Sequence, residues 1–152
     1  MQVLNFPSFQ FQFSAEGQRK LIYDIIRKKY VSLTPEEWVR QHVIHYLAEH
    51  LSYPTGLLSV EKMLKLNGLS KRTDIVAYVT SGAPKLIVEC KAPGIQINQQ
   101  VFDQIARYNI TMQVPFLLVT NGLNHFVCKI DLNNKKYTFT ETIPTFQELI
   151  TL

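Results

Sequence analysis

The sequence predicts a three-layer α/β domain, in which a central mixed β-sheet is flanked by helices. Apolar residues recur at helical spacing in some segments and form short runs in others, in the order helix, helix, three strands, helix, three strands, helix. The third strand, the helix after it and the next strand form a crossover unit, which makes two neighbouring strands parallel. Short turns join the remaining strands, so the sheet is expected to be mixed.

The N-terminal residues are expected to extend a core of roughly residues 30–130. Phe9, Phe11 and Phe13 alternate with glutamines, which predicts a half-buried strand, and Pro7 favours an edge position. Glu16 to Lys29 is predicted to be a helix. Its charged residues are read as a solvated helix face or as a mild bias toward an anionic partner. The cations of this segment are Arg19, Lys20, Arg27, Lys28 and Lys29.

A second helix is predicted to begin at Thr34-Pro35-Glu36-Glu37. Thr34 suits the N-cap, Pro35 the first helical position and Glu37 the third, where it can complete a capping box. The helix is expected to end near His50 to Ser52, ahead of Tyr53-Pro54.

The chain then changes to strand patterns. Leu57–Leu66, Asp74–Val79 and Lys85–Cys90 are predicted to form a meander, with a turn at Asn67-Gly68. Asn98 is expected to cap a helix that runs to about Met112.

The last part of the chain is predicted to complete the sheet. Phe116–Val119 is wholly apolar, as expected for a parallel strand covered on both faces. Two further strands are predicted over His125–Ile130 and Tyr137–Thr142, and a short closing helix over Thr145–Leu152.

Composition is that of an ordinary globular protein. The chain has 152 residues, 46% of them hydrophobic, and a formal net charge of +4, which fits one domain over residues 1–152. Cys90 and Cys128 lie in apolar runs and are expected to be buried, unpaired thiols. No apolar run approaches the roughly 18 residues of a membrane span, and we expect a cytoplasmic protein with no membrane association.

Charged residues interrupt two of the strands that otherwise read as core. Asp74 begins one strand, and Glu89 and Lys91 share one face of the next, separated by Cys90. Two neighbouring carboxylates repel each other, and a shared divalent cation resolves this repulsion. Mg²⁺ prefers such oxygen ligands, and the backbone carbonyl of Cys90 is a further candidate ligand. The alternative is a surface ion pair among these side chains.

These residues resemble a known motif. Asp74 followed by Glu89-x-Lys91 resembles the PD-(D/E)XK nuclease motif, and the chain looks like the N-terminal nuclease domain of type I restriction enzyme R subunits. The resemblance implies a restriction-endonuclease-like fold and rests on five ordered blocks. They are Thr34-Pro35-Glu36-Glu37-Trp38-Val39-Arg40-Gln41, Arg72-Thr73-Asp74-Ile75-Val76, Val88-Glu89-Cys90-Lys91-Ala92-Pro93, Gln104-Ile105-Ala106-Arg107-Tyr108 and Val119-Thr120-Asn121-Gly122.

The resemblance also implies roles for individual residues. Asp74 and Glu89 correspond to the metal ligands and Lys91 to the catalytic lysine. Gln104 and Tyr108 correspond to a Gln-x-x-x-Tyr element that contacts the site or the substrate backbone. The alternative for Tyr108 is packing in the core with its hydroxyl at the edge. A third acidic ligand would come from the first core helix. Glu37 is preferred over Glu36 for this role, and its competing role is that of a helix cap.

The function implied is a Mg²⁺-dependent deoxyribonuclease, with Mn²⁺ as a substitute. The family's proline before the aspartate is Thr73 here, and no GxxxxGK[ST] loop is present, so we expect a nuclease without its own motor. DNA is the expected partner, a separately encoded helicase or methyltransferase a further one, and homodimerisation is left open. One alternative is a module of the same fold that binds nucleic acid or a partner protein without cutting. The weakest alternative is a purely structural α/β protein.

Overall fold

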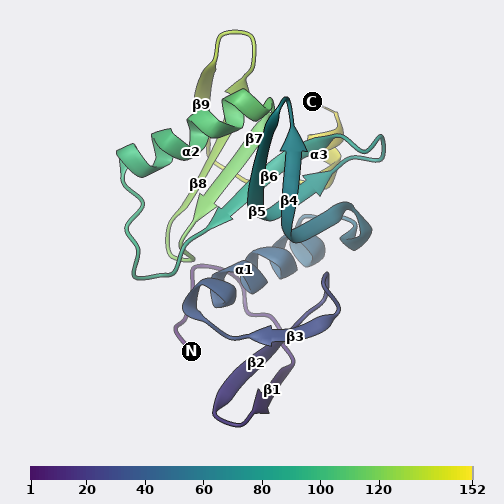
Figure 1. Cartoon of the computed structure of the whole chain (residues 1–152), viewed down its shortest axis with the longest axis vertical. Coiled ribbons are helices and arrows are strands. Elements are labelled where there is room, and N and C mark those ends of the chain that lie inside the picture. The colour runs from purple at the N-terminus through teal and green to yellow at the C-terminus, as the bar shows by residue number, and fades with distance from the viewer. Residues whose placement is uncertain (152) are drawn as a thin grey trace.

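The computed structural model describes residues 1–151 and has a six-stranded mixed sheet between two long helices (Figure 1). The strands lie side by side in the order in which they follow one another along the chain. This arrangement confirms the predicted three-layer α/β fold. The strands are β4 (Leu58–Leu66), β5 (Leu69–Tyr78), β6 (Pro84–Cys90), β7 (Phe116–Thr120), β8 (His125–Asp131) and β9 (Lys136–Thr140).

Strand directions follow the predicted connections. β4, β5 and β6 form an antiparallel meander, and β7, β8 and β9 form a second one. β6 and β7 are parallel, with Val88 opposite Leu118, because the helix between them returns the chain to the same end of the sheet. The apolar run Phe116–Val119 of β7 is explained by the burial of this strand on both faces.

The helices begin at the positions that the N-cap residues of the sequence predicted. Helix α1 (Pro35–His45) follows Thr34, whose hydroxyl accepts from the Glu37 backbone N–H at 3.1 Å, and continues as a π-helical turn, η1 (Tyr46–His50). Helix α2 (Gln99–Met112) is capped by Asn98. Helix α3 (Phe146–Ile150) carries a capping box between Thr145 and Glu148. The predicted end of this helix at Leu152 lies outside the described residues. A 3-10 turn, η2 (Thr55–Leu57), leads into β4.

Each long helix covers one face of the sheet with its own apolar cluster. The first cluster joins α1 residues such as Val43 to Ile75 and Val88 of the sheet. The second joins Phe102 of α2 to Ile87. Because β5 and β6 contribute alternate residues to the two clusters, both strands are buried on both faces. No helix within residues 1–151 combines the length and apolar character that a membrane span requires.

The predicted helix over Glu16–Lys29 is wrong. The chain there forms a small antiparallel sheet of β1 (Phe13–Glu16), β2 (Arg19–Asp24) and β3 (Lys29–Ser32). Gly17, with φ 62°, turns β1 into β2. The Asp24 carboxylate accepts from the backbone N–H groups of Ile26 and Arg27, at 2.7 and 2.8 Å, and so offers the backbone a turn in place of a helix.

The strand predicted over Phe9 to Phe13 is also largely wrong, because regular pairing begins only at Phe13. The alternation of aromatic residues instead reflects contact with α1. The rings of Phe9 and Phe11 lie 6.0 and 4.9 Å from the ring of His42, centroid to centroid. An extended segment packed on a helix gives the same period of two as a strand in a sheet.

The turn after β7 leaves no space for a side chain at Gly122. This residue has φ 86°, and a Cβ atom there would lie 2.9 Å from Leu4 Cδ2 and 3.1 Å from Val39 Cγ2. We therefore expect Gly122→Ala to lower the free energy of unfolding by about 1–3 kcal/mol, measured by urea denaturation. Gly56→Ala is the matched control, because a Cβ at Gly56 meets nothing within 4 Å. Equal stability of the two variants would contradict this account of the turn.

Candidate active site

The candidate site lies where β5 and β6 part. Their pairing ends at Ile75 opposite Val88, and the same register places Asp74 opposite Glu89. The Asp74 side chain turns into the space between the strands, where its Oδ2 accepts from the Cys90 backbone N–H at 2.9 Å. Both residues are only 8% exposed. The structure thus brings together the two acidic residues that the sequence singled out, in a buried setting.

Glu89 feels its buried environment strongly. Burial raises the pKa of its carboxyl to about 7; Lys71 opposes the rise, and the charge of Asp74 adds to it. Lys71 Nζ lies 2.6 Å from Glu89 Oε1 and also sits over the ring of Tyr108, 5.1 Å from the centroid. Tyr108 donates its hydroxyl to the Ser70 carbonyl at 2.8 Å. Tyr108 is therefore connected to Glu89 through Lys71.

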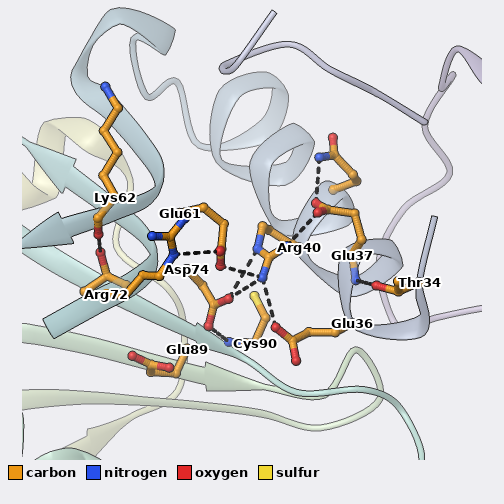
Figure 2. A network of polar contacts seen from close by, with 12 residues as sticks. Thr34, Glu36, Glu37, Arg40, Glu61, Lys62, Arg72, Asp74, Glu89 and Cys90 are labelled. Carbon is orange, nitrogen blue, oxygen red and sulfur yellow. Dashed lines mark hydrogen bonds and ion pairs between the residues drawn. The ribbon is translucent and has the colours of Figure 1, made fainter. Parts of the chain in front are cut away.

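Arg40 of α1 stands at the centre of the ionic contacts around Asp74 (Figure 2). Its Nε and Nη2 donate to Asp74 Oδ1 at 3.2 and 2.6 Å. The same guanidinium group pairs with three further carboxylates at 2.7 to 2.9 Å: Glu36, Glu37 and Glu61. Burial alone would lower the pKa of Arg40, but the hydrogen bond to Asp74 and the charge of Glu37 raise it. Arg40 is therefore held as a permanent cation against Asp74.

Glu37 faces this cluster, and its carboxylate is surrounded by donors. Arg27 Nη2 donates to both of its oxygens at 2.9 Å, Arg40 Nη1 donates at 2.7 Å, and Gln41 Nε2 donates at 3.0 Å. Its backbone N–H is capped by Thr34, but its side chain points to the arginines. A metal-ligand role for Glu37 stays a prediction, and it would require these donors to be displaced. Glu36 is closer to solvent, with a side chain 47% exposed.

The structure gives the remaining predicted residues different positions relative to the site. Lys91 directly follows β6, and its backbone N–H donates to the Thr120 carbonyl at 2.8 Å. Burial and Asp74 raise the pKa of Glu36, whereas Arg40 and Lys91 lower it, so the Lys91 charge acts on this cluster. Gln104 is exposed on α2, and the structure brings no contact between it and Asp74 or Glu89 within the described part of the chain. The roles of Lys91, Gln104 and the Cys90 carbonyl stay predictions.

The alternation of residues along the strands did not predict that Lys71 lies beside Glu89, and the backbone at Glu61 gives the reason. Glu61 has φ 54° and interrupts the pairing of β4 with β5 opposite Asp74. Before this point Val60 packs against the α1 face, but Leu64, an even number of residues later, packs against the α2 face. The two strands therefore twist at the site, so that residues of the same parity point to opposite faces before and after it. This twist brings Lys71 to the face where Glu89 lies. A non-glycine residue at positive φ often marks a functional site.

Asp74 and Glu89 are the side chains that could hold a divalent cation. Within residues 1–151 no group of three or more His, Cys, Asp or Glu side chains is gathered closely enough to form a cation site by itself. The other ligands would have to be backbone carbonyls, waters or substrate oxygens, which is the coordination that Mg²⁺ commonly adopts. The ionic network has five carboxylates, Asp24, Glu36, Glu37, Glu61 and Asp74, against three guanidinium groups, Arg27, Arg40 and Arg72. Its excess of negative charge favours an added cation.

Comparison with known proteins assigns the chain to a family. The family described as "Type I restriction enzyme R protein N terminus (HSDR_N)" matches residues 35–144, which include α1, the whole sheet and α2. The chain belongs to this family. The part of the chain that matches this family includes Asp74, Glu89 and Lys91. Comparison with curated protein sequences gave no significant match.

A solved structure supports the fold of this R-protein N-terminal region. The chain resembles a fragment assigned to the HsdR subunit of a type I restriction enzyme from Vibrio vulnificus YJ016, with a TM-score of 0.55 and 20% sequence identity. The similarity covers 78% of this chain and 25% of the other, so the chain corresponds to about a quarter of that fragment. At this identity the likeness supports the fold alone, and it agrees with a restriction-endonuclease-like arrangement.

The raised pKa of Glu89 predicts a pH dependence of stability. Between the ordinary value of 4.5 and about 7, Glu89 is protonated in the folded protein and ionised in the unfolded chain. The folded state binds more protons in this window, so the free energy of unfolding should fall as the pH rises through it in metal-free buffer. Glu89→Gln removes the titrating group and should flatten this part of the profile, measured by urea denaturation.

The control for this experiment is Glu16→Gln, whose side chain is 75% exposed. It should keep the parent's slope between these pH values. A Glu89→Gln profile that runs parallel to the parent throughout the window would show that Glu89 is not the group responsible.

Proposed function

We propose that this chain is a metal-dependent nuclease domain that hydrolyses DNA phosphodiester bonds, as the N-terminal part of a type I restriction R protein. The observation that carries the proposal is the placement of Asp74 and Glu89 opposite each other on β5 and β6, both buried, with Lys91 directly after the end of β6. Membership of the R-protein family supports it independently.

The proposed roles follow from the chemistry of these groups. Asp74 and Glu89 would hold Mg²⁺ or Mn²⁺ together with the Cys90 carbonyl, and Glu37 is a tentative further ligand. The bound ion would lower the pKa of a water molecule and offset charge on the phosphate. Lys91 would orient the attacking water or stabilise the negative charge that develops on the phosphate. Gln104 and Tyr108, one helical turn apart on α2, are proposed to contact the substrate backbone.

The burial of two neighbouring carboxylates is the physical reason to expect a bound cation. Burial, and to a smaller extent the charge of Asp74, raises the pKa of Glu89 even with Lys71 beside it, so the ionised form of Glu89 is disfavoured in the folded protein. A divalent ion between the carboxylates would restore the ionised form of Glu89. Metal binding should therefore release a proton below about pH 7 and strengthen as the pH rises.

A second candidate function is a module that binds nucleic acid or a protein partner without cutting. The observation that favours it is that both carboxylates already have cationic partners, Arg40 for Asp74 and Lys71 for Glu89. In such a module these ion pairs would serve stability alone. The nuclease proposal instead requires at least one of them to loosen when the metal enters.

A cleavage assay distinguishes the two candidates. The purified protein is incubated with supercoiled plasmid and with single-stranded circular DNA, in Mg²⁺, in Mn²⁺ and in EDTA. Nicking or linearisation that needs the metal supports the nuclease. Binding of DNA in a gel-shift assay, with no cleavage in either metal across a range of pH, would support the non-cleaving module. A separately encoded helicase or methyltransferase subunit is added in a parallel reaction as a proposed partner.

A further inference from the structure

A cleft of about 590 Å³ opens between the β2–β3 turn and the β4–β5 strands, on the α1 side of the candidate active site. Ile25, Ile26, Leu58 and Val60 contribute apolar surface to its lining. Its charged lining is strongly one-sided, with five cations and one carboxylate. These residues are Arg27, Lys28, Lys29, Lys62, Arg72 and Glu61.

The arginines of this cleft are already used by the protein. Arg27 is paired with Asp24 and Glu37, at 2.7 and 2.9 Å, and Arg72 Nε lies 3.1 Å from Glu61 Oε2. Both arginines therefore shape the wall of the cleft more than they offer free charge.

The three lysines of the cleft are different. Lys28, Lys29 and Lys62 are exposed, and within residues 1–151 none of their ammonium groups forms an ion pair. Lys28 holds φ 55° in the turn that joins β2 to β3, so the fold places it at the cleft in spite of an unfavoured backbone conformation. Three like charges around one concave surface repel each other, and a ligand with several negative charges relieves this repulsion.

The cleft and the candidate active site share a wall. From the cleft, Arg72 contacts Glu61, Glu61 Oε1 lies 2.9 Å from Arg40 Nη2, and Arg40 Nη2 lies 2.6 Å from Asp74 Oδ1 (Figure 2). A polyanion bound in the cleft would therefore lie beside the ionic network that ends at Asp74. Lysine offers a mobile point charge that binds phosphates without reading bases, which suits a backbone contact.

We propose that this cleft is the docking groove for the phosphodiester backbone of the nucleic-acid substrate. Lys28, Lys29 and Lys62 bind successive phosphates and deliver the strand to Asp74 and Glu89. The inference rests on the proposed nuclease function for what happens at the end of the groove, but binding in the groove itself needs neither metal nor cleavage. The small sheet β1–β3 thereby has a role beyond packing, because its turn builds one wall of the groove.

The test replaces the three lysines by glutamine, K28Q/K29Q/K62Q, and measures binding of a fluorescein-labelled DNA duplex by fluorescence anisotropy in EDTA. The matched control is K129Q/K135Q/K136Q, which removes the same charge from exposed lysines of the β8–β9 hairpin, at the opposite end of the molecule from β1–β3 (Figure 1). Thermal unfolding of all three proteins verifies that the substitutions leave the fold unchanged.

We expect the groove variant to bind DNA at least about tenfold more weakly than the parent. The slope of log K against log salt concentration should become less steep by about two to three, because roughly 0.9 counterion is released for each phosphate contact. The control should change neither quantity by a comparable amount. Equal losses in both variants, or none in the groove variant, would overturn the inference. If the parent binds DNA through these lysines but never cleaves it, the groove proposal stands and the nuclease proposal fails. If both variants cleave DNA like the parent, the nuclease proposal stands and the groove proposal fails.

Discussion

Lys91→Ala should lower the rate of metal-dependent DNA cleavage by about 100- to 1000-fold while the protein remains folded. This is the expected cost of removing a group that stabilises charge in the transition state. Lys91 directly follows β6, and its charge acts on Glu36 of the ionic network around Asp74, which fits the proposed role. The measurement is the initial rate of plasmid nicking under single-turnover conditions in Mg²⁺.

The control is Lys85→Ala, which removes a lysine from the other end of the same strand. It should nick DNA at a rate close to that of the parent. Lys91→Ala should also still bind Mn²⁺, because the carboxylates are unchanged. A Lys91→Ala protein that retained more than a tenth of the parent's rate would remove Lys91 from the proposed mechanism.

Arg40→Met should destabilise the protein by about 3–5 kcal/mol, which is the usual cost of breaking a buried ion pair by removing one partner. Methionine keeps much of the apolar stem of Arg40 but leaves Asp74 and Glu37, both nearly buried, facing each other without the guanidinium. The measurement is urea denaturation in EDTA. Arg107→Met, on the exposed side of α2, is the matched control and should change stability by less than about 0.5 kcal/mol.

The same variant tests whether Arg40 and a divalent cation serve the same carboxylate. If both neutralise Asp74, Mn²⁺ should raise the melting temperature of Arg40→Met by more than it raises that of the parent. A loss of less than 1 kcal/mol in EDTA would show that the ionic network contributes little. An equal response of the two proteins to Mn²⁺ would show that Arg40 does not oppose the metal.

The fold from α1 to β9 could be predicted because each element carries its own local signal. Thr34 and Asn98 are N-cap residues that predict the starts of their helices, and the apolar run of β7 reflects burial on both faces. The N-terminal sheet could not be predicted in the same way. Leu21, Ile22, Ile25 and Ile26 fit a helical stripe, and the decisive turn at Asp24 depends on side-chain hydrogen bonds that spacing does not reveal.

The site was predictable in its acidic residues and not in its cations. Asp74 and Glu89 stand out because a carboxylate interrupts an apolar strand, and pairing of β5 with β6 then brings them together. Arg40 carried a weaker signal, since it follows Glu36 and Glu37 on one helical face, but its contact with Asp74 spans 34 residues. Lys71 carried none, because it reaches Glu89 only through the face change at Glu61.

The central claim is that Asp74 and Glu89 are buried together in order to hold a divalent cation. A calorimetric titration with Mn²⁺ tests this most directly, because it requires no knowledge of the nucleic-acid substrate. The parent should show saturable binding that strengthens as the pH rises toward about 7 and levels off above it, and Asp74→Asn, which keeps the shape of the side chain, should lose it. A parent that binds no Mn²⁺, or an Asp74→Asn variant that binds it equally well, would contradict the claim.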